Sequence, residues 1–126
     1  IGWRATGAFD ATALVTAYSE YAVVGINNVD GSIFAAHEIN TTATSDDSGV
    51  NWGDAETRAL KSCITGTTRV PTAGYTAAGG TTFTQITLTN SGGAQTTATA
   101  MVPFILYLQG ATTDGNIFIN WWEVTR

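Results

Sequence analysis

The residues that could carry acid–base or nucleophilic chemistry are few in this chain. His37 is the only histidine, and Glu38 follows it in a segment that predicts a strand. Neighbouring residues of a strand point to opposite faces, so these two groups cannot converge on one substrate as acid–base catalysis requires. Serine and threonine are abundant, but none lies in a G-x-S-x-G nucleophile elbow. We therefore expect no enzymatic activity and assign no catalytic residue.

An acidic segment offers oxygen ligands for a hard cation. Asp46 and Asp47 lie in a predicted Ser/Gly-rich loop, and Asp54 and Glu56 follow. Calcium binds carboxylate oxygens, although this spacing is not that of an EF-hand loop, and a solvated acidic loop is the alternative. If the chain were an enzyme after all, Asp46 and Glu56 would be its candidate carboxylate pair.

Other cofactors and charged partners are not expected. One cysteine and one histidine cannot build a zinc site of the usual kind, and no phosphate-binding or dinucleotide fingerprint is present. The net charge is −5, and the five basic residues are scattered, whereas nucleic-acid binding needs clustered Lys and Arg. No apolar run approaches the roughly 20 residues of a membrane span. We therefore expect no cofactor, no nucleic acid and no membrane insertion.

Three local features bear on the origin of the chain. Cys63 has no second cysteine to pair with and is predicted to be a small buried apolar residue. Asn40-Thr41-Thr42 matches the N-glycosylation pattern, which favours a secretory route. The chain starts with Ile1-Gly2-Trp3-Arg4, without an initiator Met or a signal peptide, so we expect a domain excised from a longer protein or a processed form.

The pattern of short β-rich runs between turn signals predicts one all-β domain over residues 1–126, an antiparallel β-sandwich or jelly roll. One short helix is expected at Asp54–Lys61, which has an acidic start and a basic end. Asn28-Val29-Asp30-Gly31 predicts a tight hairpin turn, and residues 72–80 are expected to form a loop. The predicted strands are Ala13–Tyr18, Tyr21–Ile26, Ser32–Ile39, Ile64–Val70, Phe83–Thr89, Thr99–Gln109 and Asn116–Thr125.

The last two predicted strands carry large apolar groups on both faces. Because one sheet of a sandwich usually covers only one face, the second face of the final strand is a candidate subunit interface. The alternative is a central strand with both faces covered within the domain. On that strand Trp121 is assigned to the core side, and the candidate interface residues are Phe118, Trp122 and Val124. A one-residue change of register would exchange the two faces.

The closing run Asn120-Trp121-Trp122-Glu123-Val124, with the Thr/Gly/Ala-rich and charge-poor composition, resembles the protruding domain of capsid proteins of small icosahedral RNA viruses, of the nodavirus and tombusvirus kind. That resemblance implies a β-sandwich spike that forms a homodimer and contacts a host receptor. The expected location is the virion surface or another extracellular site. Similar traits describe the trimeric jelly-roll heads of phage fibres and of tumour-necrosis-factor-like or complement-like domains. A carbohydrate-binding module, with Trp52 or Trp3 stacked on a sugar ring, is the third alternative.

Overall fold

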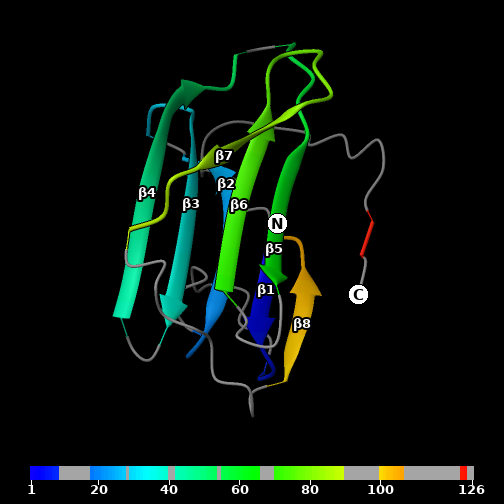
Figure 1. Ribbon diagram of the computed structural model, residues 1–126. Coiled ribbons are helices and arrows are strands. Elements are labelled where there is room, and N and C mark those ends of the chain that lie inside the picture. The colour runs from blue at the N-terminus through cyan, green and yellow to red at the C-terminus, as the bar shows by residue number, and fades with distance from the viewer. Residues whose placement is uncertain are drawn as a thin grey trace.

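The computed structural model describes residues 1–8, 18–27, 29–39, 42–53, 55–65, 70–89, 100–106 and 123–124. Within these ranges the chain is all-β and contains no helix. The strands form two antiparallel sheets that pack face to face as a β-sandwich, with β5 and β6 in front of β1 and β2 in the view of Figure 1. The all-β prediction is therefore confirmed.

In the described residues the larger sheet has five strands in the order β4-β3-β2-β1-β8, and the smaller has three in the order β5-β6-β7. Strands β1 to β4 follow one another within one sheet, and β8 returns to pair with β1. This order does not confirm the jelly-roll alternative. The larger sheet consists of β1 (Gly2–Ala5), β2 (Tyr21–Ile26), β3 (Ser32–Ile39), β4 (Thr42–Asn51) and β8 (Met101–Phe104), and the smaller of β5 (Leu60–Thr65), β6 (Val70–Thr76) and β7 (Phe83–Ile86).

The main hydrophobic core lies between the two sheets. Alternate residues of β2 and β3 point toward the smaller sheet, and residues of β6 and β7 meet them. Val50, Trp52, Leu60 and Leu88 pack around this cluster as half-buried neighbours. The buried residues of the cluster are Val24, Ile33, Ala35, Ala73, Tyr75 and Ile86.

Strand β2 is buried on both faces. Tyr21 and Val23 point away from the smaller sheet, yet they are only 1% and 7% exposed. They form a second cluster with Ala36, against which Phe34 and Phe104 pack. Strand β2 therefore carries buried apolar side chains on both faces, and its outer face is covered within the chain.

The outer face of the larger sheet also carries a cation–aromatic contact. The Arg4 guanidinium carbon lies 4.3 Å from the centre of the Tyr18 ring and 5.9 Å from that of Phe104. The two rings themselves are 6.4 Å apart. This contact places a cation against the second apolar cluster, where the methylene groups of Arg4 can cover apolar surface.

The predicted turn between β2 and β3 is confirmed for its described residues. Gly31 has a φ of 74°, a left-handed conformation that glycine adopts without steric cost. Its N–H donates to the Asn27 carbonyl over 2.9 Å, and the Ser32 N–H donates to the Asp30 carboxylate over 2.9 Å. The Asp30 side chain thus takes up a backbone donor at the start of β3.

The acidic segment predicted as a loop is part of β4, the edge strand of the larger sheet. The register shifts between Ser32 and Phe34 of β3, where β4 accommodates extra residues. Asp47 accepts a hydrogen bond from the Gly49 N–H over 2.8 Å, and Gly49 has a φ of 71°. Bulges and charges of this kind protect an edge strand from pairing with other chains.

The predicted helix at Asp54–Lys61 is wrong over its described part. Ala55 has a φ of 63°, which no right-handed helix contains, and Leu60 and Lys61 belong to β5. The Arg58 side chain reaches back to Glu56 and across to the Thr76 carbonyl. These tertiary bonds override the local helix propensity.

Two further predictions in the middle of the chain need correction. The predicted strand Ile64–Val70 runs across the boundary between β5 and β6. The predicted loop at residues 72–80 is largely β6, the central strand of the smaller sheet. Pro71 is a fully buried residue of this strand. Strand β1 was not predicted at all.

The remaining predicted strands are only partly described. Tyr21–Ile26 and Ser32–Ile39 are confirmed with the predicted bounds, and β7 and β8 are shorter than Phe83–Thr89 and Thr99–Gln109. Tyr18, Glu123 and Val124 lie outside any strand. Residues 13–17, 66–69, 99, 107–109, 116–122 and 125 of the predicted strands lie outside the described residues.

Candidate functional site

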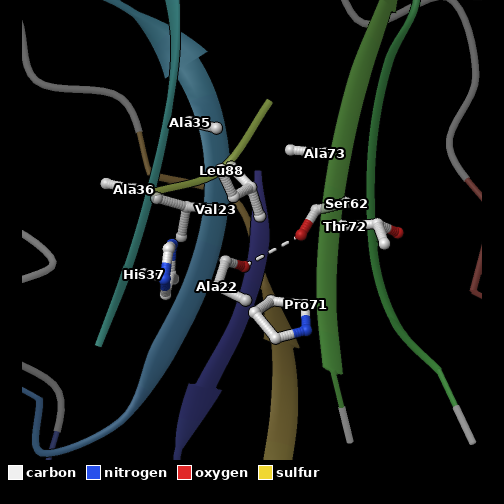
Figure 2. Close-up of a pocket in the computed structure, with 10 residues that line it drawn as sticks. All are labelled: Ala22, Val23, Ala35, Ala36, His37, Ser62, Pro71, Thr72, Ala73 and Leu88. Atoms are coloured by element: carbon white, nitrogen blue, oxygen red, sulfur yellow. Dashed lines mark hydrogen bonds between the residues drawn. The ribbon is translucent and has the colours of Figure 1, made fainter. Parts of the chain in front are cut away.

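His37 lies in the middle of the sandwich rather than on its surface. On β3 it shares the inward face with Ile33 and Ala35, and it is 1% exposed. Its register partners are Ala22 on β2 and Thr44 on β4. Figure 2 shows the ring beside β2, below Val23 and Ala36, and the hydrogen bond from the Ser62 hydroxyl to the Ala22 carbonyl (2.9 Å) that links the two sheets. Glu38 lies on the opposite face, as its neighbouring position predicts.

The Thr44 hydroxyl is the polar partner of the buried ring. Its oxygen lies 3.1 Å from Nδ1 and 3.0 Å from Nε2 of His37. A neutral imidazole has one donor and one acceptor nitrogen. Since a hydroxyl can donate or accept, Thr44 serves either tautomer.

Thr89 ties the segment after β7 to the edge strand β4. Its N–H donates to Asp46 Oδ2 over 2.9 Å, and its hydroxyl donates to Asp46 Oδ1. The Thr44 hydroxyl also lies 3.5 Å from the Thr89 carbonyl oxygen. We call Thr44, Asp46 and Thr89 the edge latch, because together they join the two sheets at one edge of the sandwich.

The surroundings of His37 favour its neutral form. Burial lowers the pKa of His37 below its ordinary value, and the negative charge of Asp46 partly opposes this effect. The ring is therefore uncharged at neutral pH. A neutral ring of this kind could act as a base only if a substrate reached it.

The residues that line the space beside His37 leave no room for a substrate. This space, between the two sheets, is too small to admit a water molecule. Acid–base catalysis requires the base within hydrogen-bonding reach of the substrate. The arrangement of these described residues is therefore that of a structural polar network within the sandwich.

The described acidic residues of this segment do not gather into a cation site. Asp46 and Asp47 are adjacent on β4 and point to opposite faces, where Asp46 binds Thr89 and Asp47 binds the Gly49 N–H. Glu56 binds Arg58 and the Gly53 N–H instead, and Asp54 lies outside the described residues. Among the residues that the structure describes, no three metal-ligating side chains come together. The two candidate catalytic carboxylates bind different groups, Asp46 the Thr89 side chain and backbone and Glu56 the Arg58 side chain.

The Glu56–Arg58 pair orders the loop before β5. Arg58 Nη2 lies 2.8 Å from Glu56 Oε2, and Arg58 Nη1 donates to the Thr76 carbonyl over 3.0 Å. The hydrogen bond from Arg58 and the Gly53 N–H lower the pKa of Glu56 below its ordinary value. Glu56 is therefore a charged structural residue at neutral pH.

The two tryptophans proposed to stack on sugar rings make hydrogen bonds within the chain. The Trp52 indole N–H donates to the Glu56 carbonyl over 3.0 Å, and its ring packs against the main core. The Trp3 indole N–H donates to the Ser62 carbonyl over 3.3 Å and so links the two sheets. Both side chains are half-buried. Cys63, predicted to be buried, is also half-buried.

The candidate interface residues are described only in part. Val124 is 44% exposed, as a residue that contacts a partner must be in the isolated chain. Phe118 and Trp122 lie outside the described residues. No sequence pattern indicated Thr44 and Thr89, because two threonines that lie 45 positions apart are brought together only by the packing of the sheets.

Comparisons with protein-family models, with curated proteins and with solved structures found no match. In the part of the chain that the structure describes, no helix has the length and apolar character to cross a membrane. The function must therefore be argued from the fold and from the residues themselves.

Proposed function

We propose that this chain is a non-enzymatic β-sandwich module that acts by binding, as the self-associating protruding domain of a small icosahedral virion. The observation that carries the proposal is that the potentially reactive side chains are hydrogen-bonded to other groups of the same chain. In the described residues His37, Asp46 and Glu56 are each bonded to other groups of the chain. A chain whose reactive groups are bonded in this way is suited to presenting a surface rather than to catalysis.

The surface composition supports a binding role at the outside of an assembly. Charged residues make up 12% of the chain, about half the usual share of a soluble domain. A surface of hydroxyl and amide groups leaves few charges to desolvate when two copies meet. The assignment to a capsid and to a virion surface rests on the sequence resemblance, which also supplies the homodimer and the host receptor as partners.

The final strand predicted from the sequence supplies the test of this proposal. Truncation of a central interface tryptophan typically costs about 2 kcal/mol or more, so Trp122→Ala should weaken association by roughly 30-fold. Trp121→Ala, assigned to the core side, should instead lower thermal stability. Sedimentation velocity and thermal melts of both variants give these two quantities.

The matched pair makes the outcome easy to interpret. Because the register could be reversed, the required result is that one neighbour weakens association and the other lowers stability. If both variants unfold, or if both keep the association of the wild type, the interface assignment fails.

A further inference from the structure

The edge latch and the buried histidine share one carboxylate. Asp46 binds the N–H and the hydroxyl of Thr89, and its charge also acts on His37. Thr44 lies between them, with its hydroxyl against the ring and near the Thr89 carbonyl. A change in the charge of His37 therefore changes the electrostatic interaction with the Asp46 carboxylate, which holds Thr89.

We propose that acidification opens the edge latch, because protonated His37 draws the Asp46 carboxylate away from Thr89. A buried imidazolium needs a counter-charge or water. Asp46 is the described carboxylate whose charge acts on His37. When its carboxylate turns toward His37, it loses the hydrogen bonds from the Thr89 N–H and hydroxyl. The N–H and hydroxyl of Thr89, which is already an exposed residue, then lose their acceptor, and the segment after β7 separates from β4.

The other groups that pack against His37 offer no competing charge within the described residues. Glu38 and Asp47 are adjacent in sequence to inward-facing residues and so point to the opposite face of the larger sheet. Glu20, just before β2, is a second buried carboxyl group and must be tested separately. The neighbours from the remaining elements are uncharged: Ala22 on β2, Ser62 on β5, Pro71, Thr72 and Ala73 on β6, and Leu88 after β7.

The direction of the pH effect follows from burial. The pKa of His37 is lowered in the folded chain, so the unfolded chain binds a proton more readily than the native one. Stability is therefore fully present above the ordinary histidine pKa of about 6.5 and falls as the pH drops below it. The latch is closed at neutral pH and opens in the acid range.

Amide hydrogen exchange of the whole 126-residue chain, read by NMR, tests the proposal. Between a pH of about 7.5 and the acid end of the His37 titration, the protection factor of the Thr89 amide should fall by at least about tenfold. Its midpoint should coincide with that of the His37 ring protons and lie below about 6.5. Unchanged protection of Thr89, or a midpoint different from that of His37, would overturn the proposal.

Matched variants separate the roles of the charges. Asp46→Asn retains a carbonyl oxygen for Thr89 but has no charge to offer His37, so the acid response of Thr89 should disappear. Asp47→Asn removes the same charge from the opposite face and should keep the response, as should Glu20→Gln. A response that persists in Asp46→Asn, or that is lost in Asp47→Asn or Glu20→Gln, contradicts the assignment. His37→Gln, if it folds, should show no response.

Discussion

Tyr21→Ala is expected to lower the free energy of unfolding by about 3–5 kcal/mol, the usual cost of truncating a buried aromatic side chain. Tyr21 is 1% exposed although it points away from the smaller sheet. In a sandwich with one solvated outer face, the same substitution would cost little. Urea denaturation followed by tryptophan fluorescence measures the difference.

The control for Tyr21 is an aromatic residue on an edge strand. Phe83 on β7 is 42% exposed, and the Lys61 amine lies 5.7 Å from the centre of its ring. Phe83→Ala should therefore cost well under half as much as Tyr21→Ala. Equal losses for the two variants would show that the outer face of the larger sheet is not covered as described.

Ile33→Ala is expected to lower the free energy of unfolding by about 2–5 kcal/mol, because Ile33 is fully buried in the main core between the sheets. Its register partner Ile26 offers a matched control, since the two residues face each other across β2 and β3. Ile26 is 45% exposed, so Ile26→Ala should cost less than about 1 kcal/mol. Chemical denaturation measures the free energy of unfolding of both variants. A large loss only for Ile33→Ala shows that Ile33 lies inside the core and Ile26 at its border.

The part of the fold that the sequence predicts is the part built from local signals. Strands β2 and β3 alternate β-branched, aromatic and small residues around an Asp-Gly turn, so both their type and their bounds could be predicted. The opposite orientations of His37 and Glu38 followed from the same alternation, whereas the burial of His37 did not. None of these features depends on residues far away in the chain.

The errors occur where distant contacts decide the local structure. Gly74 in β6 resembles a loop residue, yet a Cβ there would lie 2.8 Å from the Thr84 carbonyl oxygen of β7, so glycine is required by the close strand pairing. The segment before β5 has helix formers, but Arg58 is held by Glu56 and Thr76. In the same way, the partners of Asp46 and His37 could not be predicted from the sequence. Asp46 binds Thr89 only because β4 packs beside the segment after β7, and His37 contacts Thr44 only because β3 pairs with β4.

The most direct test of the proposed function is the mass of the wild-type chain in solution, measured by light scattering over a range of concentrations. A self-associating virion spike predicts a mass that rises from the 13.2 kDa of one chain to that of a dimer. A trimer would point to the fibre-head alternative instead. A mass that stays at 13.2 kDa up to high concentration would contradict the proposal that this module works by self-association.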